Sequence, residues 1–595
     1  MNKDTGTGPA LARQLDQNWL RLTLVAWAAV ALWFVIQRWP AIHWLALGDT
    51  DDNMRLMQVR ALLHGQSWYD LRQYRMNPPA GFNIHWSRIV DLPLAGLILL
   101  FRPLLGTAMA ERLACGIAPL LPLSVAMVAL SFTVRRLVSG FAWPLAIIFL
   151  LGCTATMLMF MPERIDHHGW QLASLAVVLA GLVDPAGRRG GVAVGLASAF
   201  SLSIGLEMLP YAAGAGAIFA LRWVWERGEA ERLGPYGLSL AGGSALGYML
   251  FASSANAALR CDALTPVWLS VMVAAGGLLA GLARLNPAQR PVRLGLAMVA
   301  GAAIIAGFAL VFPQCLGRPE QVSPELAREW LNNVREARPI YAHSFRAAFP
   351  VAVLPVIGIV GAAIAAWRAR GTAQLTGWLA VLLFTSFSAA LLLWQARAGP
   401  AAQLLAVPGA VALAWIVLPW CLHHTNMAVR VLGTVGGFLV VSGLFAGFVI
   451  KYLPVDPPSK GAKAVNRAAA SCPTIPSLNP LNKLRPQTIF TFVDLGPRLI
   501  TVTHHNAVAG PYHRNGAAIL DVQHAFKGTP AQFRAIARRH GATLLLLCPN
   551  MAESTIYRAR APGGFYDLMA QNKVPGFLTP LPLPRGSALR LWRIN

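Results

Sequence analysis

The amino-acid sequence predicts a polytopic α-helical membrane protein that carries a soluble α/β domain after its last membrane span. Of its 595 residues, 56% are hydrophobic and only 13% are charged, whereas about one quarter of an average soluble protein is charged. Apolar runs, many long enough for the roughly 20 residues that cross a bilayer, recur from Trp19 to Val449. The chain from residue 451 onward is more polar and alternates between strand-like and helix-like patterns.

The N-terminal segment is polar up to Gln17 and contains no short apolar stretch followed by a cleavage site. We therefore interpret the first apolar run as a retained membrane span and not as a signal peptide.

The net charge of +25 raises the possibility of a nucleic-acid-binding protein, but the arginines do not gather on one soluble segment. Many lie in short loops between apolar runs, as the positive-inside rule predicts. The excess charge therefore indicates membrane topology. The seven cysteines form no CxxC motif, which argues against a zinc cluster.

Thirteen apolar runs are predicted as membrane spans. They centre on residues 20–37, 115–134, 140–159, 170–183, 191–205, 208–222, 237–253, 265–283, 294–312, 348–367, 376–394, 402–421 and 429–449. A further apolar stretch, 91–106, is short and interrupted by Pro93 and Pro103. We predict that it packs at the outer interface without crossing, because this choice places the short basic loops on the inner side. These loops contain Arg135, Arg136, Arg188, Arg189, Arg222, Arg227, Arg232, Arg284, Arg290, Arg293, Arg368, Arg370 and Arg430.

This topology predicts a membrane domain over residues 1–450 and a soluble outer domain over 451–595. The outer loops are then 38–90, 160–169 and 313–347. The corresponding location is a bacterial inner membrane, with the N-terminus in the cytoplasm and the C-terminal domain in the periplasm.

Four cysteines fall on the predicted outer side, with Cys261 and Cys315 in loops and Cys472 and Cys548 in the soluble domain. Either pair can form a disulfide in an oxidising compartment. Buried free thiols are the alternative, because sequence does not establish pairing.

Five elements are predicted in the C-terminal domain from hydrophobic pattern and turn residues. Strands are expected at Thr488–Val493, Leu499–Val502, Ala517–Leu520 and Thr543–Cys548, and a helix at Pro530–His540.

The first outer loop contains the acidic sequence Asp49-Thr50-Asp51-Asp52 beside the first span. Carboxylates supply the hard oxygen ligands that Mg²⁺ or Mn²⁺ prefers, and they can deprotonate or orient a nucleophile. A solvated helix cap is the alternative interpretation.

The second outer loop contains Arg164-Ile165-Asp166-His167-His168. Asp166 and His168 stand at alternate positions and can face one metal ion. For a single histidine, the simpler alternative is an ordinary residue at the membrane surface.

Three further charged residues lie near predicted membrane boundaries. Glu336 stands where the amphipathic helical pattern of the third long outer loop ends, and Arg397 stands at the outer end of the eleventh span. The arginine fork matches phosphate geometry, although a snorkelling interface arginine has the same pattern. Glu207 is a functional candidate because an acidic side chain at a membrane boundary has a high free-energy cost, but the sequence indicates no partner for it.

These features resemble the oligosaccharyltransferase catalytic subunits of the GT-C superfamily, of the bacterial and archaeal type. That family has thirteen spans, long first and fifth outer loops and a C-terminal domain outside, which is the layout predicted for the whole chain. Asp51-Asp52-Asn53-Met54-Arg55 is similar to the family's D-x-Y-x-(H/N)-x-R motif, with Asp51 in the best register and Asp52 next. Arg164-Ile165-Asp166-His167-His168 is similar to the second motif, and Glu336 and Arg397 resemble the fifth-loop glutamate and the donor-phosphate arginine.

The family's W-W-D-Y-G motif, which reads the acceptor sequon, is not intact. Phe492-Val493-Asp494-Leu495-Gly496 stands in its place and keeps only the aspartate and the glycine. The acceptor-side candidates are Asp494, His504, His505, His513 and Arg514. A loop of structurally engaged histidines is the alternative interpretation of the region from 504 to 514.

The resemblance implies a metal-dependent inverting glycosyltransferase. It would move a sugar or oligosaccharide from a polyprenyl-phosphate or polyprenyl-pyrophosphate donor to an unidentified acceptor on the outer face. The implied ligands for Mg²⁺ or Mn²⁺ are Asp51, Asp166, His168 and Glu336. The implied catalytic residues are Asp51, Asp52 and Glu336. The resemblance also implies that Arg397 binds the donor phosphate. A lipid or sugar transporter of the cell envelope is the main alternative, and a non-catalytic scaffold is a third.

Overall fold

The computed structural model describes residues 13–454 and 457–595. Its first part is almost entirely helical. The helices are α2 (Trp19–Gln37), α3 (Trp39–His43), α4 (Thr50–Leu63), α5 (Asp91–Ile117), α6 (Leu120–Leu137), α7 (Trp143–Gly152), α8 (Thr154–Leu158), α9 (His168–Val183), α10 (Gly187–Ile204), α11 (Leu209–Trp225), α12 (Ala230–Phe251), α13 (Pro266–Leu285), α14 (Arg290–Val311), α15 (Pro324–Glu329), α16 (Phe345–Arg368), α17 (Leu375–Leu391), α18 (Gly399–Leu422), α19 (Thr434–Val441) and α20 (Phe445–Tyr452).

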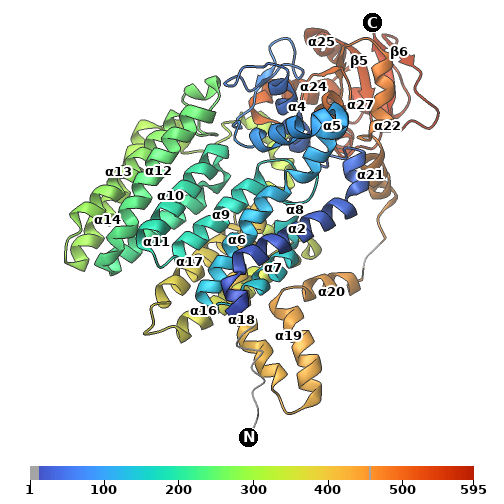
Figure 1. Ribbon diagram of the computed structural model, residues 1–595. Helices are drawn as coiled ribbons and strands as arrows, with labels where there is room; N and C mark the ends of the chain where they lie inside the picture. The colour runs from blue at the N-terminus through green and yellow to red at the C-terminus, as the bar shows by residue number, and fades with distance from the viewer. Residues whose placement is uncertain (1–12, 455–456) are drawn as a thin grey trace.

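Each of the thirteen predicted spans falls on helical structure. Six helices in the described residues are long and apolar enough to cross a membrane, or seven if the bent pair of Val429–Val441 and Phe445–Tyr452 is one span. The two members of that pair meet at 89°, and Figure 1 shows α20 turned away from α19. The count of thirteen spans therefore stays a prediction, because several apolar helices are short or broken.

The stretch 91–106 belongs to helix α5, which bends at Gly106 (φ 71°) soon after Pro103. Leu99 and Leu104 on this helix are exposed. At its start, Asp91 is buried and accepts hydrogen bonds from the guanidinium groups of Arg55 (2.8 Å) and Arg88 (3.1 Å). These bonds hold the beginning of α5 against α4.

Small residues allow the membrane helices to approach closely. Gly358 and Gly361 of α16 face Gly409 of α18, and a Cβ atom on Gly361 would clash with the Gly409 carbonyl oxygen. A larger side chain there would force the two helices apart.

Contacts between loops agree with the predicted grouping of the basic loops. The Gln374 side chain donates to the Arg136 carbonyl (3.3 Å), and Arg222 donates to the Leu182 carbonyl (2.7 Å). Neighbouring basic loops thus lie side by side at their helix ends, while the side of the membrane that they face stays a prediction.

The C-terminal part contains a five-stranded mixed sheet in the order β4-β3-β5-β7-β6. The pairs β3–β4 and β3–β5 are parallel, and β5–β7 and β6–β7 are antiparallel. The elements are α21 (Lys460–Ser471), α22 (Ile475–Leu478), β3 (Thr488–Phe490), α23 (Gly496–Val502), β4 (Asn506–Ala507), α24 (Gly516–Lys527), α25 (Pro530–Arg539), β5 (Ala542–Leu547), α26 (Ala552–Arg560), α27 (Phe565–Ala570), β6 (Leu578–Leu581) and β7 (Arg590–Ile594). A separate hairpin, β1 (Arg72–Gln73) with β2 (Phe82–Asn83), lies in the first long loop.

Two predicted strands in this region are wrong, whereas β3, α25 and β5 agree with the prediction. Leu499–Val502 lies in helix α23, and Ala517–Leu520 lies in helix α24. Ala518, Val522 and Ala525 are buried along one face of α24, and this helical period extends beyond the four residues predicted as a strand.

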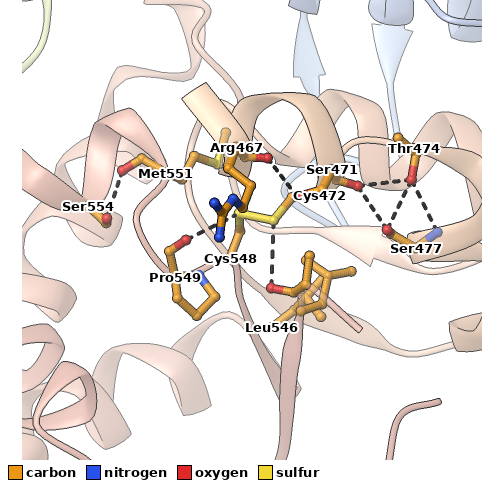
Figure 2. Close-up of a disulfide and its surroundings, with 12 residues drawn as sticks. Arg467, Ser471, Cys472, Thr474, Ser477, Leu546, Cys548, Pro549, Met551 and Ser554 are labelled. Atoms are coloured by element: carbon orange, nitrogen blue, oxygen red, sulfur yellow. Dashed lines mark hydrogen bonds between the residues drawn. A yellow bond between two sulfur atoms is a disulfide. The ribbon is translucent and has the colours of Figure 1, made fainter. Parts of the chain in front are cut away.

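Both cysteine pairs on the predicted outer side form disulfides. Cys261 is bonded to Cys315 and Cys472 to Cys548, with Cα–Cα distances of 5.4 and 6.1 Å. Figure 2 shows the second bond joining the end of α21 to the segment that follows β5.

Figure 1 shows the C-terminal elements beside α4 and α5 at one end of the helical bundle. Helix α23 packs on α4. The first outer loop and the C-terminal part therefore meet at this end, and the candidate site lies between them.

Candidate functional site

Helix α4 carries the first acidic motif in its opening turn. Asp49 is the N-cap, and its side chain accepts a hydrogen bond from the Asp51 backbone N–H at 3.2 Å. Capping by aspartate satisfies one of the free N–H groups of a helix start. The cap thus fixes where the helix begins, and it presents Asp51 and Asp52 in the first turn.

Arg164 from the second outer loop binds three of the nearby carboxylates. Its guanidinium lies 2.6 Å from Asp49, 3.2 Å from Asp52 and 2.7 Å from Asp166. Asp52 also accepts the Asp166 backbone N–H at 3.1 Å. The two predicted acidic motifs, 114 residues apart in sequence, therefore form one cluster.

His168, the first residue of α9, extends this cluster. Its Nδ1 lies 2.9 Å from the Asp166 carboxylate, and its backbone N–H donates to the same carboxylate at 3.1 Å. The structure thus brings together four of the predicted residues, namely Asp51, Asp52, Asp166 and His168. We refer to these residues with Asp49 and Arg164 as the acidic cluster.

The pKa values in the acidic cluster are shifted in opposite directions. Burial, and then the charges of Asp49 and Asp166, raise the pKa of Asp51 to about 7. Burial likewise raises the pKa of Asp52 well above its usual value. By contrast, burial is outweighed at Asp166 by His168 and Arg164, which hold its pKa well below the usual range. Burial is also outweighed at His168, where Asp166 raises the pKa to about 9. Arg164 and His168 thus face the carboxylates of Asp49 and Asp166, while Asp51 and Asp52 hold their protons more readily than a free aspartate.

Asp51 is the carboxylate in the cluster that is open to a ligand. Within residues 13–454 and 457–595, no hydrogen bond or ion pair engages its oxygens, and its side chain is half-buried. It is therefore available to a cation or to an acceptor hydroxyl.

The donor set fits a hard divalent cation in its chemistry. Carboxylate oxygens with one imidazole are suitable ligands for Mg²⁺ or Mn²⁺. In the described residues, however, no three histidine, cysteine or acidic side chains converge closely enough to hold an ion. The carboxylates converge on Arg164 instead.

Glu336 and Arg397 pair with each other. The Arg397 guanidinium lies 3.1 Å from the Glu336 carboxylate, which is 61% exposed. Their segments are joined by a hydrogen bond from the Ala396 N–H to the Arg338 carbonyl (2.7 Å). Among the residues that the structure describes, no three histidine, cysteine or acidic side chains are grouped to hold a metal ion, so the predicted four-ligand set is not assembled.

Asp494, the aspartate of the altered acceptor motif, is exposed at the end of the short segment that follows β3. The negative charge of Asp49 helps to raise the pKa of its carboxyl. The backbone N–H groups of Val493 and Asp494 donate to the Glu553 carboxylate at 3.0 and 2.9 Å. This buried glutamate thus fixes the turn that directs Asp494 within electrostatic reach of the acidic cluster.

The other acceptor-side candidates have structural partners. His504 contacts the Leu484 carbonyl at 2.7 Å through Nε2. His505 is fully buried, with Nε2 2.8 Å from the Leu481 carbonyl and Nδ1 accepting the Gln487 N–H at 3.2 Å. These contacts match the alternative of structurally engaged histidines.

His513 and Arg514 both bind Asp262, which sequence reasoning missed. Arg514 donates to the two Asp262 oxygens at 2.7 and 2.8 Å, and His513 Nε2 lies 2.6 Å from one of them. Asp262 follows the disulfide-bonded Cys261. This junction ties the C-terminal part to the loop after α12.

Asp262→Ala is expected to destabilise the protein by about 3–5 kcal/mol, because it leaves the buried Arg514 guanidinium without its partner. Burial is outweighed by Arg514 and His513, which hold the Asp262 pKa well below its usual range. Because the pKa of Asp262 is lower in the folded than in the unfolded protein, its ionised carboxylate stabilises the fold above about pH 4. This stabilisation is lost progressively as the pH falls below that value. Thermal unfolding of purified protein in detergent measures both effects. Glu325→Ala, whose contact with His524 is exposed on both sides, should change stability by only about 0–1 kcal/mol, and an equal effect of the two variants would contradict the prediction.

Two other features of the site do not follow from the sequence. Arg164 stands in the second motif, two residues before Asp166, but nothing in the motif shows that it joins carboxylates from both loops. Glu207 has partners after all, since its carboxylate lies 3.2 Å from His167 Nε2 and accepts the Gln171 amide at 2.9 Å. No local pattern connects these residues, because they meet only through the packing of the helix ends.

No protein-family model matches the chain, and no curated protein sequence matches it. Solved structures do match. The archaeal oligosaccharyltransferase AglB from Archaeoglobus fulgidus, in complex with an inhibitory peptide and a dolichol-phosphate, superposes with a TM-score of 0.67 at 14% identity, over 95% of this chain and 73% of that one. The same enzyme tethered to an acceptor peptide with an NVT sequon gives 0.65 at 14% identity, over 95% and 73%. Its complex with Zn and sulfate gives 0.60 at 15% identity, over 93% and 71%. The chain thus shares the fold of the archaeal oligosaccharyltransferase, and its long apolar helices are those of a membrane protein.

Proposed function

We propose that this protein is a glycosyltransferase that moves a sugar or oligosaccharide from a polyprenyl-phosphate or polyprenyl-pyrophosphate donor to an acceptor. The observation that carries the proposal is the acidic cluster, which joins two loop motifs on a GT-C fold. A transporter has no need for four carboxylates and a histidine gathered at one end of its helices beside a C-terminal domain.

Asp51 is the proposed catalytic carboxylate. Its oxygens are free within the described chain and its pKa is raised to about 7, which suits a group that accepts a proton from an acceptor near neutral pH. Asp52 is the less suitable candidate, because it is buried and already binds Arg164 and the Asp166 N–H.

Asp51, Asp166 and His168 would hold the divalent cation, with Glu336 as a further candidate. When bound, a Mg²⁺ or Mn²⁺ ion neutralises negative charge that develops on the leaving phosphate. Arg397 supplies a fixed positive charge suited to a phosphate group, and its present partner is the Glu336 carboxylate. A single displacement would invert the anomeric carbon.

The acceptor is proposed to differ from an asparagine sequon. Phe492 and Val493, which stand where the family has its two tryptophans, are buried in the C-terminal core. Asp494 is the exposed residue of this segment, and it is the proposed acceptor-side group. AglB has been solved tethered to an acceptor peptide with an NVT sequon, and the altered segment of this chain is the reason to expect another acceptor here.

The finer topology is also proposed. Thirteen spans would place residues 1–450 in a bacterial inner membrane with the N-terminus in the cytoplasm, and residues 451–595 in the periplasm. The two disulfides support an oxidising compartment for the loops and the C-terminal part.

The test is sugar transfer by the purified full-length protein in detergent, with a labelled polyprenyl-phosphate sugar and a mixture of envelope glycans, lipids and peptides as acceptors. Transfer is expected without any ion or substrate gradient. Chelation with EDTA should lower the rate by about 100-fold or more, and Mn²⁺ should restore it. A protein that moves the labelled lipid across vesicles but transfers no sugar would instead be a transporter.

A further inference from the structure

The first segment of the C-terminal part is strongly basic. Residues 457–493 contain five basic residues and no acidic residue. The five are Lys460, Lys463, Arg467, Lys483 and Arg485, and all are exposed. In the part of the chain that the structure describes, none of their side chains forms an ion pair. The segment lies on the predicted outer side, so membrane topology does not explain its charge as it does for the inner loops.

Helix α21 presents three of these cations along one face. Lys460, Lys463 and Arg467 have the i, i+3, i+7 spacing that aligns side chains on a helix. Ala468 is buried, and the C-cap Cys472 is held by the disulfide shown in Figure 2. These contacts fix the helix on the C-terminal part and leave the three cations in solvent.

The segment that follows α21 forms one side of a cleft of about 470 Å³. It contributes the apolar side chain of Ile475, the amides of Asn479 and Asn482, and the ammonium group of Lys483. Trp44 of the first outer loop contributes an indole ring. A cleft of this volume, lined mainly by apolar groups with a few polar ones, is typical of a site for a small molecule.

Trp44 indicates that the cleft lies at the membrane boundary. It comes shortly after the first candidate span, Trp19–Gln37, and is 52% exposed, as Trp39 is at 43%. Exposed tryptophans beside a span are typical of the layer in which lipid headgroups lie. Figure 1 shows α21 near the end of α2, and Ile475 lines the cleft together with Trp44. The basic face of α21 and the cleft are therefore next to lipid headgroups.

We propose that this cleft, together with the basic face of α21, binds the headgroup of an anionic phospholipid of the bilayer. The ammonium and guanidinium groups match the charge of a phosphate diester. The apolar lining suits the glycerol backbone, and the asparagine amides donate to headgroup oxygens. Binding attaches the C-terminal part to the membrane surface where the chain leaves the helical bundle.

The experiment measures lipid binding to the purified full-length protein in a neutral detergent by native mass spectrometry. Phosphatidylglycerol is the anionic probe, and phosphatidylcholine with the same acyl chains is the neutral one. The wild type should bind phosphatidylglycerol about tenfold or more tightly, since each basic residue near anionic lipid contributes about fivefold to binding. Lys483→Gln should lower this affinity about fivefold, and the combined change of Lys463→Gln, Arg467→Gln and Lys483→Gln should lower it about 100-fold.

The matched control is the combined change of Lys573→Gln, Arg585→Gln and Arg593→Gln. These three basic residues are also exposed, but they lie within or beside β6 and β7 and do not line the cleft. The control removes the same charge and should keep the wild-type affinity for phosphatidylglycerol. All these side chains are exposed, so every variant should unfold at the wild-type temperature in the absence of lipid.

Equal affinity of the wild type for the two lipids, or unchanged affinity in the combined variant of α21 and the cleft, would overturn the proposal. Loss in that variant without any loss in Lys483→Gln would overturn the cleft as the binding site. Inorganic phosphate separates a lipid from a free anion. If it displaced phosphatidylglycerol at a concentration equal to that of the lipid, the ligand would be a free anion and the lipid assignment would be overturned. The proposed sugar transfer is independent of each of these outcomes.

Discussion

Asp51→Asn is expected to lower the rate of sugar transfer by about 10³-fold, the largest effect on activity that the site predicts. The amide keeps the shape of the side chain but can neither accept a proton nor ligate a cation as a carboxylate does. No described residue bonds to the Asp51 oxygens, so the variant should fold. Single-turnover transfer from a labelled polyprenyl-phosphate sugar measures the effect.

The same variant should be more stable than the wild type at alkaline pH. The folded-state pKa of Asp51 is raised to about 7, above the usual value near 3.9. The folded protein therefore binds more protons than the unfolded chain between these values, and stability falls as pH rises through this window. Asp51→Asn removes this loss of stability. The free energy of unfolding of the variant is expected to exceed that of the wild type by about 1–2 kcal/mol at pH 8, after allowance for solvent screening.

Asp521→Asn serves as the control for both measurements, because Asp521 lies in α24 of the C-terminal part, outside the acidic cluster, where it pairs with Arg539 and His540. It should transfer sugar at the wild-type rate. If Asp51→Asn kept more than about one tenth of wild-type activity, a loss far below that expected of a proton acceptor, Asp51 would not be the catalytic carboxylate.

The helical part of the fold was predictable because a bilayer imposes length and composition on each span. The same reasoning could not identify the bend between α19 and α20, since no proline interrupts that apolar run. In the C-terminal part, Ala517–Leu520 was too short a window to separate strand from helix. Only the continuation to Phe526 reveals the helical period.

The candidate site was predictable where its residues are close in sequence. The aspartates of α4 and the Asp166–His168 pair are local clusters of polar chemistry in an apolar chain. Their union through Arg164 depends on the packing of loops 114 residues apart. The partnership of His513 and Arg514 with Asp262 has the same cause, and no local pattern encodes it.

Arg164→Met is expected to give the largest loss of stability at the site. The guanidinium is the cation that Asp49, Asp52 and Asp166 share, and its side chain is only 19% exposed. Methionine fills much of its volume but leaves the carboxylates uncompensated. Removing one partner of a buried ion pair costs about 3–5 kcal/mol, which thermal unfolding in EDTA should detect.

The control is Arg539→Met, since Arg539 also pairs with an aspartate, Asp521 at 2.6 Å, but is 60% exposed, and Asp521 keeps His540 as a second partner. Exposed pairs contribute about 0–1 kcal/mol, so this variant should unfold close to the wild type. Equal stability of the two variants would contradict the role given to Arg164.

The response of this variant to divalent cations then tests whether the acidic cluster is gathered to bind a cation or only to bind Arg164. If the acidic cluster binds a cation, Mn²⁺ should stabilise Arg164→Met more than it stabilises the wild type, because the ion replaces the missing positive charge. At a concentration of about 100 times Kd, binding contributes about 2.7 kcal/mol, enough to recover much of the loss. Stabilisation of Arg539→Met should match the wild type. An Arg164→Met protein that stays unstable in Mn²⁺ would mean that these carboxylates are gathered for the arginine alone, and the cation would have to be sought elsewhere.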